Sequence, residues 1–143
     1  MVRQWLVRAA LPVVALVVAG PAGAWGLSGL ESVRVEVAAE EGADPLDAEV
    51  ELLRALQEAG VSAGAAARAR LRLDLVPVDG GWSAGLVLTQ PLCLERDPLQ
   101  CADQPTWVEV VTDRDAADPI SLVGEVAARF VAAWRRANPR ASD

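Results

Sequence analysis

Residues 69–112 read ARLRLDLVPVDGGWSAGLVLTQPLCLERDPLQCADQPTWVEVVT, and this stretch decides the fold. Three of its segments have the alternation and the composition of β-strands: ARLRLDLVPV at 69–78, GWSAGLVLTQPLCL at 81–94 and TWVEVVT at 106–112. Asp79 and Gly80, between the first two segments, predict a tight hairpin turn. We therefore expect three consecutive strands that form the backbone of a sheet.

Alternation also predicts which face of the sheet each side chain occupies. In the first strand the apolar positions form the core face, namely Ala69, Leu71, Leu73 and Leu75. The second strand is uncharged on both faces, which is typical of a central strand. In the last strand we expect Val108 and Val110 on the core face, with Trp107 and Glu109 on the opposite face.

A fourth strand and two helices complete the pattern. ESVRVEVAA at 31–39 alternates as a half-buried strand does. Asp44 and Pro45 are typical of a helix start, and Gly60 of a helix end, so we expect a helix over 45–59. Its inward stripe should be Leu46, Val50, Leu53 and Leu56, with Leu52 and Ala59 beside it.

The second helix is expected over 120–137, after another Asp-Pro start and before Asn138 and Pro139. Its apolar face should hold Ile120, Val123, Ala127, Phe130 and Trp134. Residues 61–67, VSAGAAA, are expected to be a linker. The order β-α-β-β-β-α predicts a two-layer α+β sandwich, with a four-stranded sheet and two helices on one face.

The N-terminus has the anatomy of a secretory signal peptide. Arg3 and Arg8 precede an apolar run, and Ala22-Gly23-Ala24 fits the small-x-small cleavage rule. A membrane anchor is the alternative, but the apolar run is shorter than the roughly 20 residues of a spanning helix. We expect cleavage before Trp25, a single domain over 25–143, a periplasmic or secreted location, and no stable membrane insertion after cleavage.

Composition narrows the chemistry. The chain has 143 residues, a formal charge of -7, no His, and Arg as its only basic residue type. Without His or Lys it cannot build a Ser-His-Asp triad, a Schiff-base lysine or a His-ligated zinc site. Loss of the leader would bring the charge to -9, and an acidic chain without a basic run is a poor partner for nucleic acid. We expect no cofactor and no metal.

Cys93 and Cys101 are predicted to form a structural disulfide, because cysteine pairs of exported chains usually oxidise. A redox pair is the alternative, but the CxxC spacing and a neighbouring basic group are both missing. In a third interpretation the disulfide rigidifies the acidic loop between the cysteines as a binding loop.

Carboxylates offer two further alternatives. Asp113, Asp115 and Asp118 resemble the start of a calcium loop, although the later Gly and Glu of such a loop are missing. Paired carboxylates can hydrolyse glycosides, and the candidates would be Glu36, Glu95, Asp97 and Glu109. No spacing singles out a pair among them.

The face of the sheet that the helices leave uncovered is the leading candidate for function. By alternation it should carry Arg34, Glu36, Arg70, Arg72, Asp74, Trp107 and Glu109. Arginine beside an exposed indole is typical of binding hot spots. The candidate binding residues are therefore Arg34, Arg70, Arg72, Trp107 and Glu109. The alternative is that these side chains only cover the sheet with salt bridges.

The pattern also resembles a group of known domains. VRVEV, LLRALQEAGV, LRLDLVPV, TWVEVV and FVAAWRRANP follow an export signal in the order seen in small exported bacterial α+β proteins. These are similar in fold to the TolB N-terminal domain and to accessory lipoproteins of envelope transport. The resemblance implies a fold and supplies no catalytic residues. The lipidated Cys of those lipoproteins has no counterpart after the leader of this chain.

We therefore expect an exported, non-enzymatic binding or envelope-assembly domain that acts through the open face or an edge of its sheet. Its partner would be an envelope protein, a small ligand or further copies of the chain. A small carboxylate-dependent hydrolase is the alternative.

Overall fold

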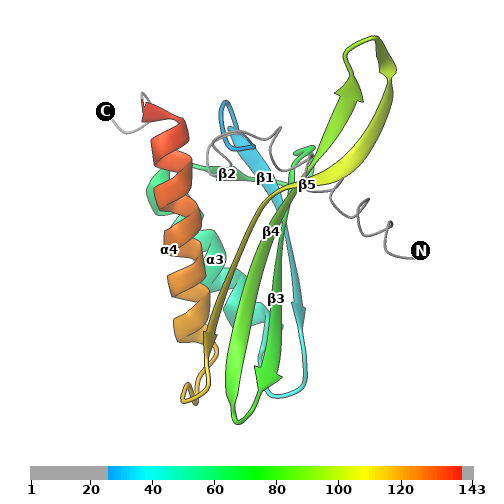
Figure 1. Cartoon of the computed structure of the whole chain (residues 1–143). Helices are drawn as coiled ribbons and strands as arrows, with labels where there is room; N and C mark the ends of the chain where they lie inside the picture. Colours follow the sequence, from blue (N-terminus) through cyan, green and yellow to red (C-terminus); the bar gives the residue numbers. More distant parts are fainter. Residues whose placement is uncertain (1–25, 140–143) are drawn as a thin grey trace, which may run out of the picture.

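The computed structural model describes residues 26–139. The predicted leader and its cleavage site before Trp25 lie outside the described residues. The fold is α+β, with one open sheet of five strands and two helices on one of its faces (Figure 1).

The sheet has the strand order β2-β1-β3-β4-β5. Its strands are β1 (Ser32–Ala39), β2 (Ser62–Ala63), β3 (Arg70–Val78), β4 (Gly81–Leu94) and β5 (Asp97–Asp113). β1 pairs parallel with β2 and β3, and the other pairs are antiparallel. The helices are α3 (Pro45–Ala59) and α4 (Ile120–Ala137), so both predicted helix ranges are confirmed. α3 packs near β1, and α4 packs over β4 and β5.

The fifth strand, β2, lies in the segment that we expected to be a linker. Gly60 adopts the left-handed conformation and ends α3, so the chain can return beside β1. The amide of Ser62 donates to the carbonyl of Glu31 at 3.2 Å, and that of Gly64 to Val33 at 3.0 Å. Two residues are too few to show alternation, so the sequence pattern does not reveal this strand.

The buried face of α3 differs from the predicted one. Leu52 and Leu56 are fully buried, whereas Leu46 is 65% and Val50 is 59% exposed. The buried face is completed by Ala48 and Ala59. These small residues let α3 approach its neighbours closely, because the distance between packed helices depends on the side chains at the contact. The prediction that Leu46 and Val50 face the core was therefore wrong.

The apolar face of α4 is confirmed, with Val123, Ala127, Phe130 and Trp134 buried. The end of this helix also holds the segment before β1. The indole of Trp134 donates to the carbonyl of Leu30 at 2.8 Å. The Asn138 amide accepts from Gly29 N–H and donates to Leu27 O, both at 2.8 Å. Asn138 therefore ties the two ends of the described domain together.

β4 has its predicted bounds, whereas β5 begins nine residues earlier than predicted, and the two strands project beyond the sheet as a hairpin. We call residues 90–104 of this hairpin the arm. Figure 1 shows it extending away from α4 and past the other strands. The expected loop between the cysteines is mostly strand, because Leu94 pairs with Asp97 and only two residues form the turn. β4 continues through Pro91 because β3 begins only at Arg70, opposite Thr89, so the proline removes no hydrogen bond to β3.

Candidate binding surface

The open face is the side of the sheet opposite α3 and α4. The predicted positions of Arg34, Arg70 and Arg72 on this face are confirmed by the strand register. Arg34 stands beside Arg70, and Glu36 beside Arg72. Their leucine neighbours Leu71 and Leu73 are fully buried on the other face, as the alternation of β3 requires.

Ion pairs connect these charges. Arg34 and Arg70 both contact Glu36, each with a nitrogen–oxygen distance of 3.7 Å. Arg72 lies 3.0 Å from a carboxylate oxygen of Asp74. All five side chains are about one third to one half exposed. Three arginines therefore share two carboxylates in this network, which leaves one positive charge without a carboxylate of its own.

Trp107 and Glu109 do not lie on the open face, and this part of the prediction was wrong. Trp107 pairs with Leu88 on the helix side, and its ring stands edge-on to Phe130 with the centroids 5.2 Å apart. Glu109 accepts a hydrogen bond from Arg129 of α4 at 3.0 Å. This bond is the largest cause of the raised pKa of Arg129. Neither residue therefore lies on the face through which it was predicted to bind a partner.

The reason lies in the edge position and register of β5. The pairing jumps from Leu88–Trp107 to Thr89–Pro105, so one residue of β5 is passed over. Glu109 can occupy the helix side because α4 offers Arg129 to neutralise it at the edge. TWVEVVT has apolar residues at both parities, so alternation does not determine its faces.

The open face carries valines in place of the expected tryptophan. Val108 is 55% and Val110 is 54% exposed. Val87 stands beside Val108 in the register, and Val110 stands beside Gly85. We call Val87, Val108 and Val110 the valine strip. It lies next to the ion-pair network, because Val87 also pairs with Arg72. Sequence reasoning missed the valine strip, because its residues come together only through the pairing of β4 with β5.

The arm is the second apolar surface that sequence reasoning missed. Leu99 is 93% exposed, Leu94 is 42% and Leu92 is 38%. The predicted disulfide is confirmed: Cys93 and Cys101 are opposed in the register and are bonded. The disulfide joins the two strands of the arm, and neither α3 nor α4 covers this part of the hairpin (Figure 1).

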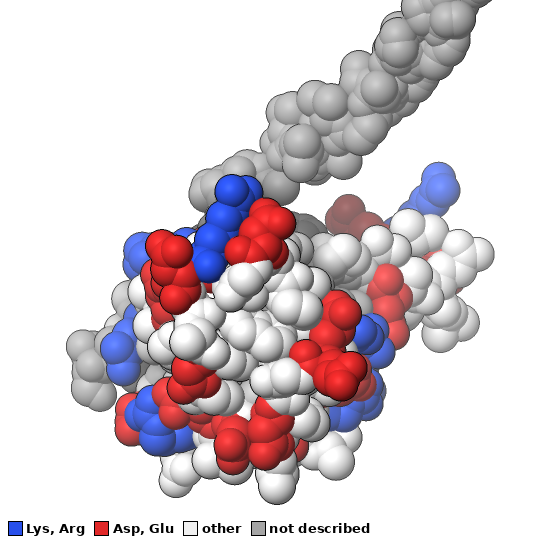
Figure 2. All heavy atoms as spheres, turned by 90° about the horizontal axis from the view of Figure 1, so that it is seen from below, with Lys and Arg blue, Asp and Glu red and all other residues white. Residues whose placement is uncertain are grey.

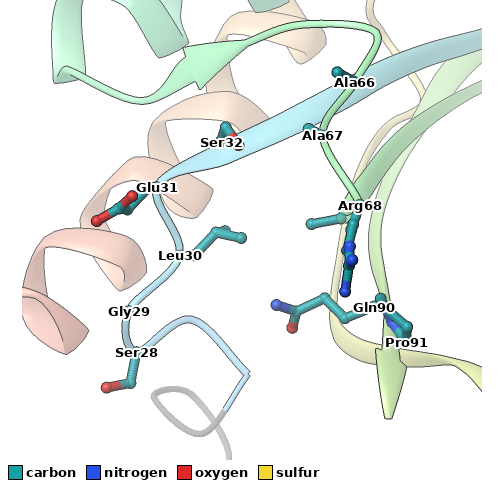
Figure 3. Close-up of a pocket in the computed structure, with 11 residues that line it drawn as sticks. Ser28, Gly29, Leu30, Glu31, Ser32, Ala66, Ala67, Arg68, Gln90 and Pro91 are labelled. Atoms are coloured by element: carbon teal, nitrogen blue, oxygen red, sulfur yellow. The ribbon is translucent and has the colours of Figure 1, made fainter. Parts of the chain in front are cut away.

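A hollow of about 440 Å³ lies at the base of the arm (Figure 3). Its walls come from 28–32, from 66–69, and from Gln90 and Pro91. Arg68 and Gln90 face it, whereas the carboxylate of Glu31 points away in this view. Among residues 26–139 no polar or charged side chain is buried, so the hollow offers no desolvated group to hold a ligand.

The carboxylates suggested for hydrolysis do not converge. Glu36 lies on the open face of β1, whereas Glu109 lies on the helix side of β5, with two strands between them. Glu95 and Asp97 lie at the tip of the arm. From the end where α4 begins, acidic side chains lie at several separate places (Figure 2). Of the four carboxylates, only Glu95 and Asp97 therefore lie near each other in the fold, and Glu36 and Glu109 do not join them.

The suggested calcium ligands have local roles. The carboxylate of Asp113 accepts from the amide of Asp115 at 2.8 Å, and that of Asp118 from Ile120 at 3.0 Å. Within residues 26–139 no three potential metal-binding side chains form a group. Asp113 therefore shapes a turn, and Asp118 accepts from the first amide of α4, one residue before the Pro119 N-cap.

Comparison with known proteins gives no family. No family model matches the chain, and no curated protein matches it. A PelC variant from Paraburkholderia phytofirmans, described as a dodecamer, is 19% identical, with 76% of this chain and 90% of that chain covered and a TM-score of 0.43. A second PelC dodecamer from the same organism is 18% identical, with 74% and 87% covered and a TM-score of 0.42.

A minor lipoprotein from Acinetobacter baumannii is 12% identical, with 78% of this chain and 95% of that chain covered and a TM-score of 0.33. These structural neighbours are bacterial proteins of low similarity, and their scores are too low to carry an inference about function. The resemblance to the TolB N-terminal domain is not tested by them and stays a prediction.

Proposed function

We propose that this chain is an exported, non-enzymatic domain that binds a protein partner through the open face of its sheet. The observation that carries the proposal is the valine strip beside the ion-pair network. Val108 and Val110 are more than half exposed on a regular strand, in a part of the sheet that neither helix covers. Contiguous apolar surface bordered by charged groups is typical of protein interaction sites.

The chemistry of the face favours a protein over other partners. Its charges are mixed in sign, which suits a polar rim around an apolar centre and not a polyanion. β5 is also an edge strand, since it pairs only with β4 among the described strands. An edge with unpaired backbone groups can accept a further strand from a partner.

The proposed location is the periplasm or the exterior of the cell. The disulfide supports it, because disulfides persist in oxidising compartments. Within residues 26–139 no helix is long and apolar enough to cross a membrane. The leader over 1–24 would direct the export.

The test is affinity capture of the tagged, exported protein after cross-linking in the native cell envelope. The double variant Val108→Asp, Val110→Asp places two carboxylates in the valine strip without touching the core. Ala128→Asp is the matched control, because it adds a carboxylate at an exposed position of α4. We expect the partner to be recovered with wild type and with the control, and lost with the double variant. An unchanged partner in the double variant would overturn the proposal.

A further inference from the structure

The arm and the open face are two unpartnered surfaces of one chain, and their chemistry is complementary. We propose that the partner of the open face is a second copy of this chain, whose arm lies across the valine strip and the arginines beside it. This inference rests on the proposed function, since it names the occupant of the same surface.

The first argument is apolar surface. Leu99 is the most exposed large apolar side chain described in the chain, at 93%. By strand alternation Leu92 lies on the side of the ribbon that faces the helices further down β4. The arm extends beyond α3 and α4, so among residues 26–139 no helix covers this side (Figure 1). Burying its leucines against the valine strip would remove both exposed apolar patches from water at once.

The second argument is charge. Residues 90–104 contain three carboxylates and one guanidinium, namely Glu95, Asp97, Asp103 and Arg96. The ion-pair network of the open face has the opposite excess, because Arg34 and Arg70 share Glu36. An acidic arm against this face would supply the missing carboxylate. Complementary potentials of this kind fix the orientation of a complex and suppress wrong partners.

The third argument concerns which copy supplies the arm. The arm continues β4 and β5 outward, away from the body that carries its own valine strip (Figure 1). The disulfide between Cys93 and Cys101 joins its two strands to each other, so the arm keeps the form of one ribbon. Because this ribbon points away from its own open face, contact between the two surfaces requires a second molecule. A cross-linked arm also loses little freedom on binding.

This contact joins two different surfaces, so it permits two closed arrangements. Two copies that exchange arms reciprocally form a twofold dimer with two identical contacts. A one-way contact that is repeated around an axis forms a ring. In both arrangements every arm requires one open face of another copy.

The test uses the purified mature chain with its disulfide intact, and measures molar mass by sedimentation over a range of concentrations. We expect wild type to assemble, and Leu99→Asp and Val108→Asp each to weaken assembly about tenfold or more, because each buries an unpaired carboxylate. Ala128→Asp, on the exposed side of α4, should assemble like wild type. A wild-type chain that stays monomeric at all concentrations overturns the inference.

Mixing the two variants gives the sharper result. Leu99→Asp retains an intact open face, and Val108→Asp retains an intact arm, so an equal mixture should form one productive contact that neither variant forms alone. Failure of the mixture to associate overturns the pairing of arm with face.

The two proposals fail separately. A monomeric wild type, combined with loss of a different captured protein in the Val108→Asp, Val110→Asp variant, would leave the proposed function standing and remove only the second copy. Capture that is unaffected by the double variant would remove the proposed function itself.

Discussion

Gly81 lies where β4 begins, in close contact with the end of β5. A Cβ added at this position would overlap the backbone of Asp113 and Arg114. Backbone atoms cannot move aside as a flexible side chain can, so the added methyl group would strain the pairing of β4 with β5. The glycine is therefore required by close approach of two chains and not by an unusual backbone angle.

We predict that Gly81→Ala lowers the free energy of unfolding by about 1–3 kcal/mol, as overpacking does. Gly64→Ala is the control, because a Cβ there meets nothing within 4 Å. That control should change stability by less than about 0.5 kcal/mol. Urea denaturation of the three proteins gives the comparison, and equal midpoints for the two variants would contradict the close approach.

A second prediction at the residue scale concerns pH. The pKa of Glu51 is lowered from its usual value of 4.5, chiefly by the hydrogen bond from Arg54. A carboxyl whose pKa is lower in the folded state stabilises the fold above the unfolded pKa, and this contribution is lost as pH falls through the folded value. Between neutral pH and about pH 3, wild type should therefore lose up to about 0.5 kcal/mol more than Glu51→Gln, as is typical of exposed helix pairs. If the free energy of unfolding fell equally with pH in the two proteins, the prediction would be wrong.

At the scale of the element, the sequence of α3 allows two different buried faces. Its leucines at 46, 52, 53 and 56 define overlapping stripes, and only packing against α4 and the sheet selects between them. The face that is buried includes two alanines, and a search for large apolar residues gives such small side chains too little weight.

We predict that Leu52→Ala destabilises the chain by about 2–5 kcal/mol, because it opens a cavity at a fully buried site. Leu46→Ala removes the same atoms from a side chain that is 65% exposed, and should cost less than about 0.5 kcal/mol. Thermal and chemical unfolding of the pair measures the difference. Equal losses of stability in the two variants would show that Leu46 belongs to the core.

The arm is predicted to depend on its disulfide more than the sheet does. Beyond Thr89 each arm strand has only the other as a neighbour, and a lone two-stranded hairpin is marginally stable in water. Closing so short a loop contributes roughly 2.5 kcal/mol in the chain-entropy picture. The Cys93→Ser, Cys101→Ser variant should therefore lose amide protection in residues 90–104 and keep it in β3. Hydrogen exchange read by mass spectrometry tests this, and simultaneous loss in β3 would show that the arm and the sheet unfold together.

Two strands, β3 and β5, show what a sequence pattern can and cannot determine. β3 was assigned correctly because leucine and charged residues alternate strictly along it. β5 was not, because Trp107, Val108 and Val111 place apolar groups on both faces, and one skipped residue exchanges the faces. Arg70 and Arg72 were therefore found on the open face from the sequence, whereas the valines beside them required the register between β4 and β5.

For the whole molecule, the two apolar surfaces matter because of where they lie. The valine strip belongs to the body of the sheet, and the arm belongs to its extension, yet both arise from the same pair of strands. Their separation depends on β3 beginning opposite Thr89, since β4 has no β3 neighbour beyond that residue. One hairpin therefore builds part of the face that we propose as a docking surface, and also the projection that we propose to dock there. Local sequence analysis cannot detect this, because it depends on the pairing of distant segments.

The last prediction concerns export of the whole chain, which the proposed location requires. Expressed in full in a Gram-negative host, the chain should appear in the periplasm with Trp25 as its first residue. Its mass should be lower by two hydrogen atoms than after reduction, because an oxidising compartment forms the disulfide. Ala24→Arg should leave the leader attached, since a large charged residue does not fit the small-residue cleavage rule. Ala22→Ser, which keeps a small side chain, is the matched control and should be cleaved. Recovery of uncleaved, reduced wild type from the cytosol would contradict both the leader and the compartment, and with them the setting in which the arm is held rigid.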